Sequence, residues 1–102
     1  MAMTHYFVSR HPGTIEWAKR LALKVTHFVA HLDADQVQAG DTVTGNLPVH
    51  LAAQLCAKGA AYWHVSMDLP VAMRGRELSA DDLEQLHARV EQFNIQIIQA
   101  PQ

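Results

Sequence analysis

The chain has 102 residues, and 49% of them are hydrophobic, which is enough apolar material for one core and too little for a second. We therefore predict a single domain over residues 1–102. The formal net charge of -2 excludes a general electrostatic attraction to long nucleic acid or to an anionic membrane, so an anionic ligand needs a local cluster of cations.

Strand and helix patterns alternate from the start of the chain. The aromatic and β-branched run at 5–8 predicts a strand, and the turn-forming run at 9–13 predicts a loop after it. Apolar residues then recur at helical spacing from Thr14 onward, and Thr14 is the predicted N-cap of this helix. With a second strand predicted over 25–32, these elements form a β-α-β unit.

The middle of the chain continues the alternation. The polar residues 33–40 allow a single helical turn, and the β-branched residues of 41–45 predict a third strand. Its direction is left open, because a parallel crossover normally needs about a dozen residues. Pro48 and Gly59 flank a predicted helix over 49–58, since proline favours the first turn of a helix and glycine the position after its end.

The last third of the chain predicts a strand, a helix and a strand. The strand over 61–67 alternates an apolar side with a polar side that includes Tyr62. Ser79 opens an S-x-x-D capping box, which predicts a helix that continues through Glu91. The last strand is predicted over 93–98, at an edge of the sheet.

This order of elements predicts an α/β, Rossmann-like fold with a mainly parallel sheet of about five strands flanked by three helices. In such sheets ligands bind beyond the carboxyl ends of the strands, where the strand order reverses. Three loops follow predicted strands, at 9–13, 45–48 and 68–76. We expect them to converge on one binding site.

Basic residues in these loops indicate an anion such as phosphate. Arg10, Arg74 and Arg76 lie there, and an arginine fork can make two charge-assisted bonds to phosphate oxygens. The alternative, that these arginines are ordinary solvated charges, stays open at this stage. His11 follows Arg10 directly, and a group that titrates near neutrality could exchange a proton with a ribose hydroxyl.

The histidine and cysteine patterns do not indicate a metal site. Seven histidines are present, but the spacings H-x-x-x-H on a helix and HExxH are missing, and so are the glycine-rich motifs for dinucleotides and for P-loop nucleotides. We expect neither a metal nor a cofactor. Cys56 is the only cysteine, which excludes an intrachain disulfide and fits a reducing compartment.

Nothing in the sequence predicts export or membrane insertion. Residues 1–10 lack the basic patch and apolar run of a signal peptide, and no apolar stretch approaches the roughly 20 residues that span a bilayer. We expect a cytoplasmic protein with no membrane partner.

The chain also carries S-R-H-P-G at 9–13, G-N-L-P-V at 45–49 and R-G-R-E-L-S at 74–79. With these runs it resembles, over nearly its whole length, the small Csx-series accessory proteins of type III CRISPR systems, specifically the sixteenth of that series. The resemblance implies a homodimeric ring nuclease, akin in fold to the CRISPR-associated Rossmann-fold sensor domains. Such a protein linearises the second messenger cyclic tetra-adenylate and so switches off the antiviral response.

Residue roles follow from position in the predicted loops. We predict Arg10 and Arg76 for phosphate charge and His11 as acid or base, with ribose 2′-hydroxyl attack making a metal unnecessary. The predicted ligand-binding residues are Ser9, Gly13, Asn46, Asp68 and Arg74. Two alternatives remain open: a protein that sequesters the cyclic oligoadenylate without cutting it, and an interaction subunit with no nucleotide ligand.

Overall fold

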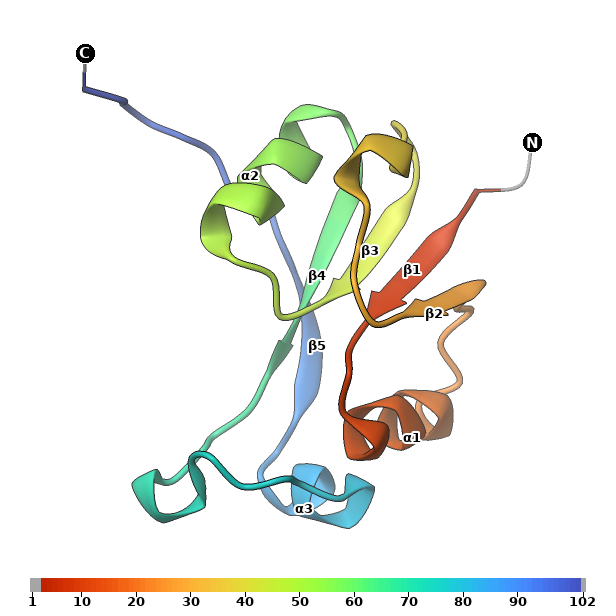
Figure 1. Ribbon diagram of the computed structural model, residues 1–102, viewed down its shortest axis with the longest axis vertical. Coiled ribbons are helices and arrows are strands. Elements are labelled where there is room, and N and C mark those ends of the chain that lie inside the picture. The colour runs from red at the N-terminus through yellow and green to blue at the C-terminus, as the bar shows by residue number, and fades with distance from the viewer. Residues whose placement is uncertain (1–2, 102) are drawn as a thin grey trace.

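The computed structural model describes residues 3–101. Its centre is one five-stranded sheet in the order β2-β1-β3-β4-β5 (Figure 1). The strands are β1 (His5–Val8), β2 (His27–Val29), β3 (Thr42–Gly45), β4 (Ala61–Ser66) and β5 (Arg89–Phe93). Strands β1 to β4 are parallel, and β5 is antiparallel to β4. The predicted mainly parallel α/β sheet is confirmed, and the antiparallel edge strand makes the likeness to a Rossmann fold approximate.

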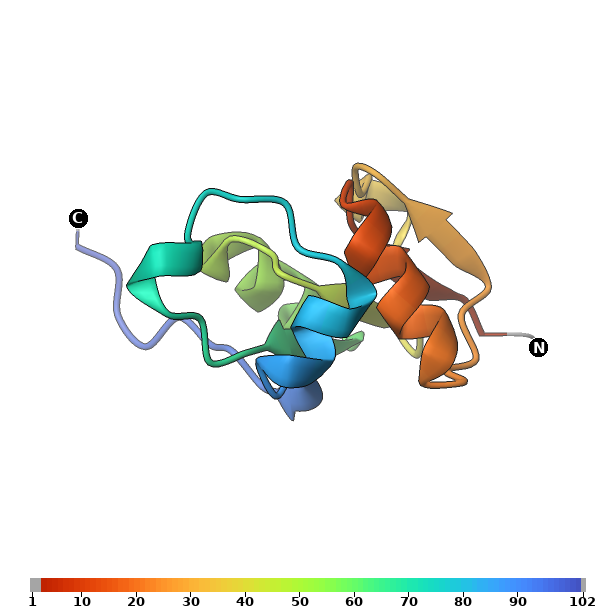
Figure 2. The same cartoon turned by 90° about the horizontal axis from the view of Figure 1, so that it is seen from below.

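The helices cover both faces of this sheet. Helices α1 (Pro12–Arg20) and α3 (Ala80–Gln85) lie side by side on one face, and α2 (Val49–Ala57) covers the other (Figure 2). The core on the α1 and α3 face is built from Phe7, Trp17, Ala18, Val65, Ala80 and Leu83. The core on the α2 face is built from Val37, Val43, Leu55 and Ala60. Short 3-10 turns at Ala34–Gln36 (η1) and Val71–Met73 (η2) complete the elements.

Several predicted elements have other bounds in the structure. Helix α1 begins at Pro12 with His11 as N-cap, so the prediction of Thr14 as N-cap is wrong. The proline explains the earlier start, because its fixed φ suits the first helical position. Strand β2 is much shorter than the predicted 25–32. The third strand, whose direction the sequence left open, is parallel to β1.

The third helix and the last strand differ most from their predictions. The capping box between Ser79 and Asp82 is confirmed, but α3 ends at Gln85 and does not continue to Glu91. His87 has a left-handed φ of 56°, which ends the helical path. The following residues pair with β4, so β5 occupies Arg89–Phe93 and not 93–98, while its position at the sheet edge is confirmed.

The side chain of Tyr62 on β4 does not face solvent. That residue was assigned to the polar side of the strand, yet it is fully buried, because α2 covers this face of the sheet. None of the helices within residues 3–101 is long and apolar enough to cross a membrane.

His5 gives the fold a dependence on pH. Its ring Nε2 lies 2.8 Å from the Thr44 hydroxyl on the neighbouring strand. Burial lowers the pKa of His5, and a hydrogen bond with the Lys24 backbone has a smaller, opposite effect. The folded chain therefore binds this proton less tightly than the unfolded chain. The stabilisation is complete above the unfolded pKa of about 6.5 and is lost as pH falls below it.

We expect His5→Gln to flatten the fall in the free energy of unfolding between about pH 7 and about pH 5, because glutamine does not titrate. A group that releases one whole proton on folding changes the free energy of unfolding by about 1.4 kcal/mol per pH unit. The difference between the two slopes should be well below this value, since the His5 ring is only partly buried. Urea unfolding of both proteins across this range measures the two slopes. Equal slopes would contradict the role of His5.

Candidate functional site

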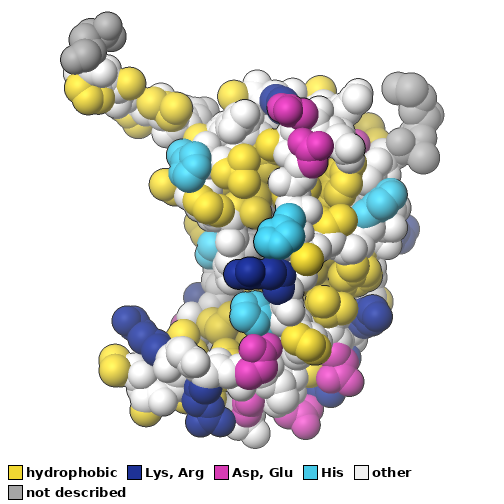
Figure 3. Space-filling model, viewed as in Figure 1, with side chains coloured by type: hydrophobic (Ala, Val, Ile, Leu, Met, Phe, Trp, Pro, Cys, Tyr) yellow, Lys and Arg dark blue, Asp and Glu magenta, His cyan; other side chains and the backbone are white. Residues whose placement is uncertain are grey.

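A cleft of about 210 Å³ lies beyond the carboxyl ends of β1 and β3. Here the strand order reverses, because β2 lies on one side of β1 and β3 on the other. The residues that line the cleft are Val8, Ser9, Arg10, His11, Thr14, Ala30, Gly45, Asn46 and Val65. In Figure 3, histidine, basic and acidic side chains gather beyond the ends of these strands. The loops at 9–13 and 45–48 therefore do converge.

Gly45 keeps the two strands close at the floor of the cleft. A Cβ on this residue would lie 2.9 Å from the carbonyl oxygen of Val8, nearer than real Cβ contacts come. The absence of a side chain at this position lets the loop with Asn46 start directly beside the loop with Ser9.

His11 pairs with a residue that the sequence did not single out. Its ring Nδ1 lies 3.1 Å and 3.2 Å from the two carboxylate oxygens of Glu77. An ionised carboxylate can only accept a hydrogen bond, so Nδ1 carries the proton in the neutral ring and Nε2 has a free lone pair. A carboxylate that fixes the tautomer of a histidine in this way is the arrangement of a general base and its orienting group.

Ser9 and Arg10 supply hydrogen-bond donors at the same place. The Ser9 hydroxyl oxygen accepts a 3.1 Å bond from the backbone N–H of His11, and its own proton stays available to a ligand. Arg10 is exposed and forms no ion pair with any residue in the range 3–101. The first-turn N–H groups of α1 have no partners within the helix. Together these groups suit an anion.

Asn46 is held by a buried tyrosine. The Tyr62 hydroxyl accepts a 3.0 Å bond from the backbone N–H of Leu47 and donates a 3.1 Å bond to the carbonyl of Gly45. His64 Nδ1 lies 2.7 Å from the same hydroxyl. Burial raises the pKa of Tyr62, which keeps the phenol neutral. The turn over 45–47 is thereby fixed from beneath.

Gly13 lies at the edge of the cleft and packs against the chain before α3. A Cβ on Gly13 would overlap the carbonyl oxygen of Leu78. Gly13, Glu77, Leu78 and Ser79 line a neighbouring depression of about 370 Å³. The close approach explains why Glu77 reaches His11.

The remaining predicted residues lie elsewhere. Asp68, Arg74 and Arg76 are exposed and do not line the cleft. Asp68 forms a 3.3 Å ion pair with Arg89. Hydrogen bonds from Ser79 hold the pKa of Asp82 below its usual value, and the charge of Arg76 lowers it further by a smaller amount, which places Arg76 near the start of α3.

Within residues 3–101, three or more histidine, cysteine or acidic side chains do not gather anywhere in a way that could hold a metal ion. The polar side chains in and beside the cleft are those of Ser9, Arg10, His11 with Glu77, Thr14 and Asn46.

The family described as "Putative CRISPR-associated protein (Cas_VVA1548)" matches residues 6–96. The chain belongs to this family. The matched range contains every residue of the cleft together with Glu77, and it confirms the CRISPR association that the sequence runs predicted. No curated protein and no solved structure matches.

We expect Gly13→Ala to destabilise the fold by about 1–3 kcal/mol, because the added methyl group forces α1 away from Leu78. Gly75→Ala is the matched control: Gly75 has φ of +81°, and its added Cβ would meet nothing within 4 Å. The control should lower the free energy of unfolding by only about 1 kcal/mol, which is the cost of an alanine in the left-handed conformation. Urea unfolding compares the two. An equal loss in both variants would contradict the steric role of Gly13.

Proposed function

We propose that the protein is a ring nuclease, which binds a cyclic oligoadenylate, cyclic tetra-adenylate foremost, and cuts it to linear products. This activity would end the antiviral signal of a type III CRISPR system. One observation carries the proposal: the cleft at the strand switch point holds an arginine that forms no ion pair within residues 3–101, beside a histidine whose Nδ1 is fixed by Glu77. Membership of a CRISPR-associated family supports it.

The cleft suits one phosphodiester of the ring. Arg10 faces the non-bridging oxygens with its guanidinium, and the Ser9 hydroxyl and the first N–H groups of α1 add donors. Asn46, with its turn fixed by Tyr62, orients the adjacent ribose or base. Arg74 and Arg76, which lie outside the cleft, are assigned to neighbouring phosphates of the ring.

The cut uses the ribose hydroxyl of the ligand itself. His11 Nε2 takes the proton of the 2′-hydroxyl, the 2′-oxygen attacks phosphorus in line, and the bond from phosphorus to the 5′-oxygen breaks. The leaving oxygen takes a proton from water, and the products carry a 2′,3′-cyclic phosphate and a 5′-hydroxyl. Arg10 stabilises the charge of the phosphorane, and Glu77 stabilises the protonated imidazole.

The size of the cleft supports a site shared by two copies. Its volume of about 210 Å³ lies below the roughly 300–1,000 Å³ of pockets that bury a whole drug-sized ligand. A cyclic tetranucleotide is larger still, so most of it stays outside one cleft. A two-fold homodimer matches the symmetry of the ring and would hold opposite phosphodiesters in its two clefts.

We expect His11→Ala to lower single-turnover cleavage of radiolabelled cyclic tetra-adenylate by about 10²–10⁴-fold, because the general base is lost. The wild-type protein should give linear products with 2′,3′-cyclic phosphate ends, equally with and without a chelator. His27→Ala, an exposed histidine outside the cleft, is the control and should cut normally. A ring that binds tightly but returns intact from the wild-type protein would show a sequestering protein and contradict the nuclease.

We expect Arg10→Ala to weaken binding of the ring by about 10–100-fold, because hydrogen bonds to a charged group are lost. Binding is measured by fluorescence polarisation in the His11→Ala background, where the ring stays intact. Lys24→Ala removes an exposed cation outside the cleft and should leave the affinity unchanged. Equal losses for Arg10 and Lys24 would show only general charge attraction. No binding to any variant, including the parent, would exclude a cyclic oligoadenylate as the ligand.

A further inference from the structure

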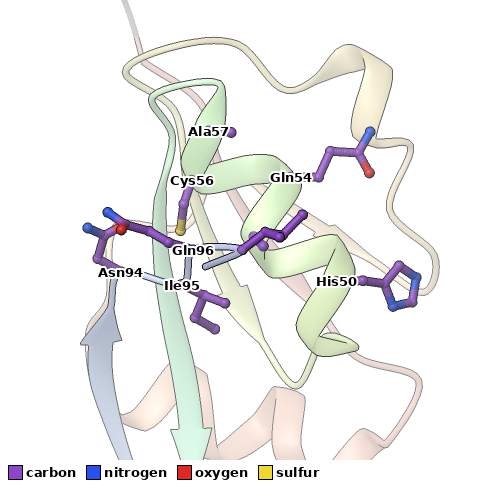
Figure 4. A pocket seen from close by; sticks show the side chains of 9 residues that line it. His50, Gln54, Cys56, Ala57, Asn94, Ile95 and Gln96 are labelled. Carbon is purple, nitrogen blue, oxygen red and sulfur yellow. The ribbon is translucent and has the colours of Figure 1, made fainter. Parts of the chain in front are cut away.

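A second hollow lies between α2 and the chain that follows β5, which we call the tail (residues 94–101). This α2–tail groove has a volume of about 620 Å³ (Figure 4). Its helix side is lined by His50, Ala53, Gln54, Cys56 and Ala57, and its tail side by Asn94, Ile95, Gln96 and Ile97. The groove is about three times as large as the cleft and shares no residue with it.

The segments that line the groove carry no charged side chain. Residues 42–57 and 92–102 contain no lysine, arginine, aspartate or glutamate, although 18% of the whole chain is charged. The polar side chains on the groove wall are amides, one imidazole and one thiol. Depletion of charge at the centre of a surface is typical of protein interfaces and atypical of a solvated face.

Large apolar side chains stand out from this surface. Ile97 is 74% exposed, Ile98 is 90% exposed, and Val49 at the start of α2 is 69% exposed. Figure 3 shows hydrophobic atoms along the projecting C-terminal segment. The tail thus extends past a mostly apolar groove without filling it, and both the groove and the exposed isoleucines need a partner to leave water.

We propose that the occupant is a second copy of this chain, and that the exposed isoleucines of each tail, Ile98 foremost, enter the groove of the other copy. A two-fold interface brings a surface against itself, so a charged patch would repel its own copy. A neutral patch avoids this repulsion. Amide side chains both donate and accept hydrogen bonds, so the glutamines and asparagine of one copy can pair with those of the other.

The tail has the reach that this exchange requires. Residues 96–101 carry no helix or strand, so when fully extended, at roughly 3.3 Å per residue, they can span about 20 Å. That reach exceeds the length of a nine-residue helix such as α2, which is about 14 Å. A tail can therefore cross the whole groove of a neighbouring copy.

The proposed interface does not depend on whether the cleft cuts a ring. It does affect where the clefts of the two copies lie. The loop with Asn46 runs directly through Pro48 into α2. Copies that meet on α2 therefore keep their clefts close to the shared boundary.

The test is the oligomeric state of the ligand-free protein. Size-exclusion chromatography with light scattering and sedimentation equilibrium over a wide concentration range should give a dimer. Ile98→Asp should raise the dissociation constant by at least about 100-fold, because each isoleucine is worth about tenfold and the two-fold axis counts it twice. The side chain is almost fully exposed, so the variant should keep the fold and the melting temperature of the monomer.

Val71→Asp is the matched control, because Val71 is 79% exposed on η2 and does not line the groove. It should leave the dimer intact. A wild-type protein that is monomeric at all concentrations would overturn the proposal. A dimer with unchanged affinity in Ile98→Asp would overturn it too, since the copies would then meet elsewhere, as along the open edge of β5.

A cross-link gives a second readout. Cys56 lines the groove and is the only native cysteine, so Ile98→Cys followed by mild oxidation with a disulfide reagent can join the tail of one copy to the groove of the other. A covalent dimer on a non-reducing gel is the expected product. A covalent monomer would show that each tail closes on its own groove, and it would contradict the exchange.

Discussion

The backbone of Gly13 lies against the carbonyl of Leu78, where an added Cβ would overlap the oxygen, and that of Gly45 lies near the carbonyl of Val8, where an added Cβ would be 2.9 Å from the oxygen. These two contacts set how near the loop after β1 comes to its neighbours on either side. Wider spacing at the first would carry Glu77 away from His11, and wider spacing at the second would open the floor of the cleft. The arrangement of the polar groups is thus a consequence of backbone packing.

The ion pairs of the structure leave Arg10 free, whereas they occupy Arg20 and Arg89 within residues 3–101. Arg20 contacts Asp81 at 2.9 Å and Glu84 at 3.0 Å and so ties α1 to α3, while Arg89 on β5 contacts Asp68, which follows β4. These cations are committed to the fold. Arg10 has no such partner among residues 3–101, and it is next to the histidine that Glu77 orients. In a chain with a negative net charge, a cation left unpaired in this way favours a local anion site, together with the first-turn N–H groups of α1.

Local sequence patterns predicted what depends on local chemistry. The strand at His5–Val8, the helix after Pro48 and the capping box at Ser79 follow from β-branching, proline geometry and hydroxyl capping, and they are confirmed. The end of α3 was missed because helical spacing continues to Val90, and only pairing with β4 draws Arg89–Phe93 into the sheet. Glu77 was missed because its contact with His11 joins residues 66 positions apart. Its only sequence signal was the R-G-R-E-L-S run.

Helix α2 connects the two surfaces that carry the proposals. Its first turn continues from the loop that holds Asn46, and its outer side forms the wall of the α2–tail groove. Tyr62 holds that loop from beneath with two hydrogen bonds, to Gly45 and Leu47, and His64 on β4 contacts the same hydroxyl. A second copy docked on α2 would therefore be held at a fixed distance from the cleft. A ligand too large for one cleft of about 210 Å³ would then meet two clefts in a defined relation, which a flexible connection could not provide.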